Sequence, residues 1–528
     1  MATGNARIDL LARAACTGLS VLAGALLALP VAAPAAAQGN EREFLPPERI
    51  DPLPNWNLSA NVTLGSDFVA RAITFTSEGP TVQGGFDITN GWFYAGIYGT
   101  ALNYGATDKN NDGVADSDGG NVEIDYYAGL RKNFKGIDFD LAYFFYSYPN
   151  AIDFGGDVDM WEIRGIVSTE TASGFKPSFT AFYTPEYTFK SGRNLIYEGM
   201  IEQRLPQMGP FSPKVSALLA YNDNETGLVR PDFWYWNAGL ALSFAERFTL
   251  DIRYWDTDIS GCKSRTVFQC EERVIARMTA LIGEPEGTAA PEAAPGAFDD
   301  LRISANVALT SDYVFRGRSQ TDEHPAIQGG FELAHSWLYS GVWASNTDFG
   351  GADVNGDGIS DSAVAPIEFD WYAGIKKELH GVDVDLGVIY YTYPNAFDGR
   401  PAAELDHIEF KGGLAGSAAG FDLGFTTYYS PDYTGEVGRN WVFEGSIERA
   451  LPDIGPFSPS LSGLVAYNDG EVNSGGLDYW YWNAGLELGF LERFALDVRY
   501  WDSDLGGCGS AGLFQCDERA VATLSAEF

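Results

Sequence analysis

The sequence has no apolar run after residue 38 that is long enough to form a membrane-spanning helix. If this chain enters a membrane, it must therefore do so as a β-barrel, the other structure that satisfies its own backbone hydrogen bonds in lipid. Basic residues are also few, with 34 Lys and Arg against 72 Asp and Glu and a formal net charge of −38. So acidic a chain repels phosphates, and we expect no nucleic-acid partner.

Cysteine is limited to five residues, and Cys16 lies in a segment with the pattern of an export signal. Residues 1–37 combine Arg7 and Arg13 with an apolar core from Leu19 to Leu29 and with the small residues at 35–37, where cleavage is expected. Residues 38–55 would then be a short N-terminal segment of the mature chain.

The remaining cysteines form two pairs, and the members of each pair are eight residues apart: Cys262 with Cys270, and Cys508 with Cys516. An exported chain meets an oxidising compartment, so we predict one local disulfide in each pair. A zinc site is the alternative, which we disfavour because neither pair has a histidine nearby.

The chain is one unit written twice. "LPQMGPFSP" from Leu205 returns as "LPDIGPFSP" from Leu451, and "RYWDTD" from Arg253 returns as "RYWDSD" from Arg499, at an offset that stays at 245 to 247. The repeats cover residues 56–282 and 301–528. Residues 283–300 between them are acidic and rich in Pro, Ala and Gly, which indicates a linker.

Each repeat contains about twelve segments in which apolar and polar residues alternate, as in "IEFDWYAGIKK" from Ile367 to Lys377. A period of two indicates β-strands with one apolar and one polar face. The polar face carries Asp, Glu, Lys and Arg. That distribution suits either the outside of a soluble sandwich or the lumen of an outer-membrane barrel, so alternation alone does not separate the two.

The connections between the strands favour the barrel. Joins such as "ITNGW" and "FAERF" are short, whereas every alternate join is long, including "SYPNAIDFGGDV" and the segments that hold the cysteine pairs. Short turns at one end and long loops at the other are typical of bacterial outer-membrane barrels. The terminal Phe528 also resembles the signal by which the outer-membrane insertion machinery recognises its clients.

The linker favours two barrels over one. In a single twenty-four-stranded barrel, strands twelve and thirteen would be neighbours joined by a short hairpin, but 18 residues separate the repeats. At about 3.1 Å per residue, a Pro-rich stretch of this length reaches roughly 50 Å. We therefore predict an all-β protein of two tandem transmembrane antiparallel barrels of about twelve strands each, in the bacterial outer membrane and in contact with its lipids.

Four stretches of the second repeat carry a family resemblance: "SDYVFRGRSQTDEHPAIQGGFE" from Ser311, "GVWASN" from Gly341, "EFDWYAG" from Glu368 and "YYTYPNA" from Tyr390. They resemble the TorF family of proteobacterial outer-membrane porins. The first repeat departs from the pattern, with "VARAITF" in place of "VFRGRSQ". The resemblance implies an outer-membrane barrel that passes small solutes, and it names no solute.

Two acidic loops have the spacing of a calcium loop. In "DKNNDGVADSD" and "DVNGDGISDS", oxygen ligands stand at positions 1, 3, 5 and 9, and position 7 offers a backbone carbonyl. The Glu expected at position 12 is missing, so we expect weak binding, at about 10⁻⁴ to 10⁻³ M, that holds an external loop in shape. A solvated loop without an ion is the alternative. The predicted ligands are Asp108, Asn110, Asp112, Val114, Asp116, Asp353, Asn355, Asp357, Ile359 and Asp361.

Charged residues on the polar strand faces are expected to line the lumen. If Asp312 and Arg316 lie on one strand, they share a face, and the spacing predicts an internal ion pair that stiffens the barrel, as for Asp67 and Arg71. An acidic lumen would favour cations. The predicted lumen residues are Asp67, Arg71, Asp312, Arg316, Glu368, Asp370, Glu444, Glu448, Glu487, Asp497 and Arg499.

Aromatic residues are dense at strand ends, as in "YWYWN" and "RYWD". We expect them to form girdles at the membrane interface, with sugar-stacking platforms as the alternative.

Enzyme motifs are scarce. The four histidines, His324, His335, His380 and His407, all lie in the second repeat, so histidine-based catalysis cannot be common to both repeats. There is no Walker loop and no zinc-protease motif. We expect no enzyme; a lipid-modifying barrel would need His324 or His407 beside a nucleophile at the membrane rim.

These observations together predict an outer-membrane porin for passive diffusion of small cationic or polar solutes, with no cofactor besides calcium in the external loops. The width of the lumen limits the size of the solute. The lumen of an eight-stranded barrel is filled by side chains, a sixteen-stranded barrel leaves a channel, and a twelve-stranded barrel lies between them. The main alternative is a non-conducting structural or surface-interaction barrel, which the absence of solute flux would reveal.

Overall fold

The computed structural model describes residues 56–103, 120–149, 151, 158–225, 232–259, 269–283, 301–349, 365–396, 405–471, 478–506 and 515–528. The predicted export signal, the segment 38–55, all ten predicted calcium ligands, and Cys262 and Cys508 lie outside these residues. The predictions that depend on them therefore stay predictions.

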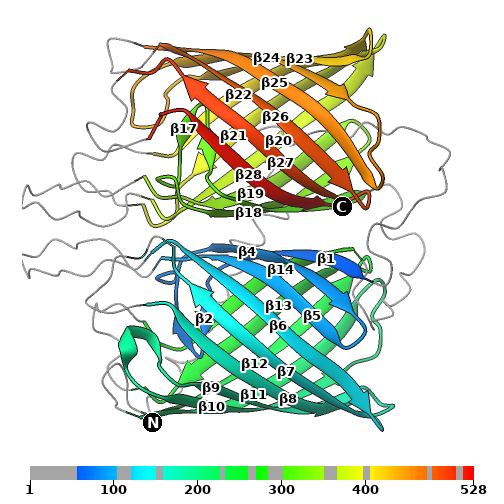
Figure 1. The fold of residues 1–528 in the computed structure, drawn as a ribbon, viewed down its shortest axis with the longest axis vertical. Coiled ribbons are helices and arrows are strands. Elements are labelled where there is room, and N and C mark those ends of the chain that lie inside the picture. Colours follow the sequence, from blue (N-terminus) through cyan, green and yellow to red (C-terminus); the bar gives the residue numbers. More distant parts are fainter. Residues whose placement is uncertain are drawn as a thin grey trace, which may run out of the picture. The chain divides into compact units, whose positions relative to one another are not determined.

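The first repeat forms a closed antiparallel barrel of twelve strands, each hydrogen-bonded to the next along the chain (Figure 1). Strand β1 closes the barrel against β14, with Ser59 opposite Gly283 at one end of the register. A short 3₁₀ helix, η1 (Thr188–Lys190), lies between two of the strands. The wall consists of β1 (Asn57–Gly65), β4 (Thr81–Asn90), β5 (Phe93–Ala101), β6 (Val122–Phe134), β7 (Ile137–Ser147), β8 (Met160–Thr169), β9 (Phe175–Thr184), β10 (Asn194–Arg204), β11 (Ser212–Asn224), β12 (Phe233–Phe244), β13 (Phe248–Thr257) and β14 (Arg273–Gly283).

The second repeat forms another closed barrel of twelve strands. Strand β15 closes against β28, and Phe528 adds two backbone hydrogen bonds to Ala305 just beyond the last strand. The wall consists of β15 (Arg302–Thr310), β18 (Ala326–His335), β19 (Leu338–Asn346), β20 (Ile367–Leu379), β21 (Val382–Thr392), β22 (His407–Ala418), β23 (Phe421–Ser430), β24 (Asn440–Ala450), β25 (Phe457–Gly470), β26 (Tyr479–Phe490), β27 (Phe494–Ser503) and β28 (Arg519–Glu527).

The prediction of two tandem twelve-stranded barrels is confirmed, and the single twenty-four-stranded barrel is excluded, because each repeat closes on itself. One boundary differs by a residue: Gly283, which we placed in the linker, is the last residue of β14 and pairs with β1. Among the described residues, no helix is long and apolar enough to cross a membrane.

The two faces of each strand differ as the alternation predicts. On β24, Phe443 and Ile447 point outward and are 38% and 46% exposed, whereas Val442, on the lumen face of the strand, is fully buried. On β26, Trp480 and its neighbour Tyr479 divide in the same way. An apolar outer face around a polar interior is stable only where lipid covers the outside. Both repeats are therefore outer-membrane barrels.

Turn chemistry explains why one end of each barrel has short connections (Figure 1). Between β6 and β7, Lys135 and Gly136 both have positive φ, and so do His380 and Gly381 between β20 and β21. Positive φ at both central residues defines the type I′ hairpin, whose twist matches that of the flanking strands. The other end carries the long connections, as the sequence predicts.

Each barrel also contains a small hairpin that lies inside the wall, in the first long connection (Figure 1). In the first barrel it pairs β2 (Val69–Ala70) with β3 (Ile73–Thr74), and in the second it pairs β16 (Val314–Phe315) with β17 (Arg318–Ser319). Neither hairpin joins the sheet of the wall. We call these the lumen hairpins.

Candidate functional site

The base of each lumen hairpin is held by an aspartate. Asp312 accepts hydrogen bonds from the hydroxyls of Ser319 and Thr321, at 2.6 and 2.9 Å, and pairs at 2.9 Å with Arg519 on β28. This fixes the start and end of the hairpin to each other and to the wall. The corresponding contacts in the first barrel join Asp67 to Thr74, Thr76 and Arg273.

The tip of the second lumen hairpin is an arginine that reaches the far wall. Arg316 donates from both terminal nitrogens to the two carboxylate oxygens of Glu409 on β22, at 2.8 and 2.7 Å. Both side chains are almost fully buried, at 2% and 1% exposure. Tyr391 also donates to Glu409, at 3.1 Å, and the hydroxyl of Tyr479 donates to the backbone oxygen of Arg316. We call Arg316 and Glu409 the tip pair of the second barrel.

The first barrel has a tip pair with a different geometry. Arg71 donates from one terminal nitrogen to Glu162 on β8, at 2.6 Å, and its side chain is 16% exposed. Glu162 is fully buried and also accepts from the hydroxyls of Tyr146 and Thr184, both at 3.1 Å.

The predicted ion pairs between Asp312 and Arg316, and between Asp67 and Arg71, are wrong. The prediction treated these residues as one strand, but β15 ends at Thr310 and Arg316 lies in a turn with φ of 53°. The chain therefore leaves the wall, and the two charges of each motif find separate partners. The signal was present in the sequence, since "RG" between two short β-prone stretches suits a type I′ turn.

Electrostatics keep both tip arginines charged. Burial by itself lowers the pKa of the Arg316 guanidinium, but the neighbouring charge of Glu409 outweighs burial, and the pKa lies well above its ordinary value. Arg71 is shifted in the same direction, with Glu162 supplying the opposing charge. Each tip pair is thus a buried ion pair, strongly dependent on both partners.

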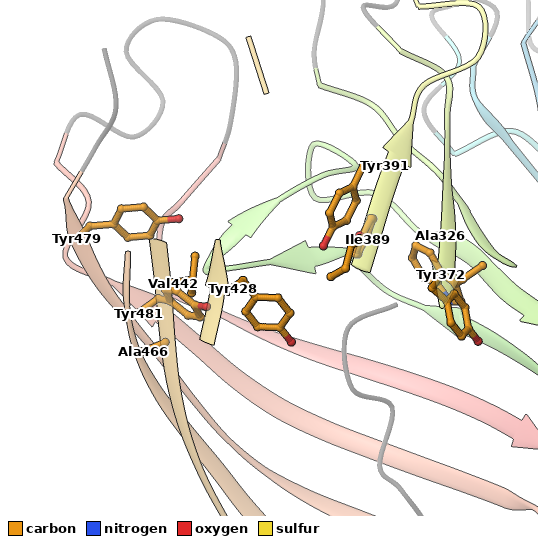
Figure 2. Packing of buried hydrophobic residues seen from close by; sticks show 11 residues of the cluster. Ala326, Tyr372, Ile389, Tyr391, Tyr428, Val442, Ala466, Tyr479 and Tyr481 are labelled. Carbon is orange, nitrogen blue, oxygen red and sulfur yellow. The ribbon is translucent and has the colours of Figure 1, made fainter. Parts of the chain in front are cut away.

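Tyrosines surround the second lumen hairpin (Figure 2). The guanidinium of Arg316 lies 5.1 Å from the ring centre of Tyr428, a cation–π contact. Tyr481 donates its hydroxyl to Glu444, one of the predicted lumen residues. The cluster has no signature in the sequence, because its members come from strands far apart in the chain.

The remaining predicted lumen residues lie on the inward faces of their strands. Glu368 and Asp370 are buried on β20 beside the hairpin. Toward the short turns, Arg499 contacts Asp497 through two nitrogens, and it also reaches Asn483 and Ser462. The last two of the predicted set, Glu448 and Glu487, share the inward faces of β24 and β26 with Glu444 and Tyr481.

The aromatic motif "YWYWN" divides between the two faces. Trp480 and Trp482 point outward and are 52% and 40% exposed, at the end of the barrel that carries the long loops, where a girdle is expected. Tyr479 and Tyr481 alternate with them and face the lumen. The girdle prediction therefore fits the tryptophans and is wrong for these tyrosines.

His407 is the first residue of β22, and its side chain is buried. Its ring stacks on Tyr391, with centroids 4.4 Å apart and an 11° angle between planes, and it meets Tyr433 edge-on. The imidazole is buried in the lumen of the second barrel.

Comparison with known proteins identifies the family to which this chain belongs. The model of a bacterial protein family of unknown function (Gcw_chp) matches residues 51–282 and again residues 294–528. The chain therefore belongs to this family and carries two copies of its domain. No curated protein matches the chain.

Solved outer-membrane structures match over most of the chain, but only loosely. They include the siderophore receptor PirA from Pseudomonas aeruginosa, at 12% identity and TM-score 0.28, covering 92% of this chain and 81% of that chain. The P pilus usher (PapC) translocation pore matches at 10% identity and TM-score 0.34, covering 89% and 99%. The FrpB iron transporter from Neisseria meningitidis matches at 8% and 0.30, covering 91% and 82%. Similarity at this level carries no argument about function.

Proposed function

We propose that this member of the Gcw_chp family is an outer-membrane porin that passes small cationic or polar solutes by diffusion, and that it is not an enzyme. The observation that carries the proposal is the charged and hydroxyl-bearing lining of both lumens. In small barrels of about eight strands, side chains fill the interior and leave no path. This chain instead places ion pairs such as Arg499 with Asp497 inside.

The lumen hairpin sets the width of the proposed path. It lies within the wall at the end with the long loops, and its tip pair spans the lumen from the first connection to β22 or β8. We infer that each barrel is narrow while the tip pair is intact. Small solutes would pass beside the hairpin or during its brief displacement, and larger ones would be excluded.

Single-channel conductance in a planar bilayer tests this proposal. We expect the purified protein to give small ohmic steps that favour cations, because the lumen carries more carboxylates than the tip arginines neutralise. Arg316→Gln removes the charge that holds the second hairpin, so it should produce a second population of larger steps. Arg439→Gln, at an exposed position outside the wall, is the matched control and should leave the steps unchanged.

Two outcomes would contradict the proposal. Silence at all voltages from correctly folded protein would favour the non-conducting structural or surface-interaction barrel. Steps that are identical in Arg316→Gln and in the control would show that the hairpin does not limit the path. Heat-modifiable migration in gels, which reports a closed barrel, establishes folding in either case.

The TorF resemblance, the calcium loops and the disulfides belong to the same proposal. We propose that calcium and the two cysteine pairs shape external loops around the two mouths, since the motifs fall on the long-loop side. Mass spectrometry of unreduced peptides would test the disulfides: free thiols at Cys262 and Cys508 in the exported protein would refute them. The terminal Phe528, at the end of the closing strand, is where the insertion machinery would bind before folding.

A further inference from the structure

A pair of buried carboxylates lies beside the lumen hairpin of the second barrel, apart from the tip pair. Glu368 and Asp370 are two residues apart on the inward face of β20, and their residues are 2% and 0% exposed. Glu368 accepts a hydrogen bond from the hydroxyl of Tyr313, at 3.2 Å. Neither carboxylate oxygen of Asp370 accepts a hydrogen bond from an N–H or hydroxyl donor among the described residues, and its polar neighbour on this face is the carboxyl group of Glu368.

The surrounding charges leave Asp370 uncompensated. The charged groups that act on it are Glu368 and Glu409, both negative. The guanidinium of Arg316 is taken up by both oxygens of Glu409. An ionised carboxylate buried without a counter-charge costs several kcal/mol. A positive charge that the described part of the chain does not supply, or a proton, must therefore occupy this position.

The first barrel repeats the arrangement. Glu123 and Asp125 hold the matching positions on β6, and Glu123 accepts from the hydroxyl of Tyr148 at 2.6 Å. Asp125 has one carboxylate oxygen without a partner in the described chain, and the charges acting on it are those of Glu123 and Glu162. The same imbalance thus occurs in two barrels whose neighbouring side chains differ.

We propose that each carboxylate pair binds a hard divalent cation of the Mg²⁺ or Ca²⁺ class. Two carboxylates balance its charge, and oxygen ligands without His or Cys suit hard ions. No group of three or more His, Cys, Asp and Glu side chains within the described chain could hold a metal. The ion therefore keeps several waters, as Mg²⁺ does when one or two carboxylates bind it. The site is independent of conduction, and it is distinct from the external acidic loops.

Equilibrium dialysis of the purified full-length protein with radiolabelled Ca²⁺ tests the proposal. The background carries Asp108→Asn, Asp112→Asn, Asp353→Asn and Asp357→Asn, so that the predicted loop sites do not contribute. In this background we expect Asp370→Asn to lose one bound ion, and the double variant with Asp125→Asn to lose two. Glu487→Gln, a lumen carboxylate of the second barrel away from the pair, is the matched control and should retain both ions.

An unchanged ion count in Asp370→Asn would overturn the proposal. The main rival is a proton shared by Glu368 and Asp370, whose carboxyl groups lie close enough to interact directly. Infrared difference spectra distinguish a bound cation from a shared proton. They are recorded on the background protein, in which both carboxylate pairs are intact. Ca²⁺ binding shifts carboxylate stretches, whereas a shared proton gives the C=O stretch of a protonated acid that Ca²⁺ leaves unaltered. Bound ions in a protein that fails to conduct would refute the porin and leave this site standing.

Discussion

The two lumen hairpins perform the same structural task with different side chains. In the second barrel the tip pair has two hydrogen bonds and is nearly inaccessible, whereas in the first it has one and Arg71 is 16% exposed. Tyr428 and Tyr479 of the second barrel stand where the first has Phe182 and Phe233. The tip pair is thus common to both repeats, and the repeats differ in the polarity of the side chains around it.

The apolar cluster at the first lumen hairpin also shows that the surroundings of the two hairpins differ in polarity. Ile73, Ile196 and Phe233 pack around its hairpin. The second barrel has Arg318, Val442 and Tyr479 at these positions. At two of these three positions the second barrel has a guanidinium and a hydroxyl where the first has hydrocarbon. If both barrels conduct, we expect the second to carry polar solutes more readily.

Removing the charge of the tip glutamate should destabilise the lumen hairpin more than any other substitution proposed here. The loss should be larger in the second barrel than in the first. Glu409→Gln leaves the Arg316 guanidinium buried without its counter-charge, a loss on the order of 3–5 kcal/mol in the stability of the hairpin. Glu162→Gln should cost less, because water reaches part of Arg71. Hydrogen-exchange mass spectrometry, on peptides that cover residues 69–74 and 314–319, measures each hairpin in the intact chain.

Arg439→Gln is the control for both glutamate variants and should change hydrogen exchange in neither hairpin. Equal acceleration in Glu162→Gln and Glu409→Gln would show that accessibility of the arginine does not distinguish the barrels.

The turn residue after each tip arginine should have the next largest effect. Gly317 has φ of 75°, and a Cβ there would lie 2.9 Å from the Cβ of Tyr481, so Gly317→Ala combines backbone strain with a clash. We expect a loss of about 1–3 kcal/mol. The first barrel already has Ala72 at this position with φ of 61°, so Ala72→Gly should relieve strain instead.

Thermal or urea unfolding, combined with the same exchange peptides, measures both turn variants. Opposite signs for the two substitutions are the expected result. A destabilising Ala72→Gly would show that the methyl group of Ala72, which is buried in the first cluster, outweighs the turn strain.

The strands of the barrel wall could be predicted from the sequence, and the contacts between side chains in the lumen could not. Period-two alternation, joins of unequal length and the repeat predicted the strands, the closure and the number of barrels, because each depends on local pattern. The partner of Arg316 is 93 residues away on β22. No local pattern pairs it with Glu409 rather than with the nearer Asp312, since the choice depends on whether the chain leaves the wall after Thr310.

For the carboxylate pair of the second barrel, too, the sequence predicts the face of the strand but not the contacts. Alternation correctly placed Glu368 and Asp370 on one face of a strand. That Asp370 has no N–H or hydroxyl donor in the part of the chain that the structure describes, whereas Glu368 has the hydroxyl of Tyr313, follows from where the hairpin base lies. Sequence indicates which residues face inward, but three-dimensional packing decides which of them are satisfied.

The smallest expected effect on stability concerns the hydroxyl group of Tyr313 in the second barrel. Tyr313→Phe gives the second barrel the residue that the first has at Phe68, and it removes the hydrogen bond to Glu368. The cost should be about 1 kcal/mol, because a buried acceptor loses one of its donors. If the pair binds an ion, Ca²⁺ affinity at the second site should fall severalfold toward that of the first. Unfolding and dialysis measure the two effects separately. If Tyr313→Phe changes neither, the hydroxyl is not what distinguishes the two carboxylate pairs.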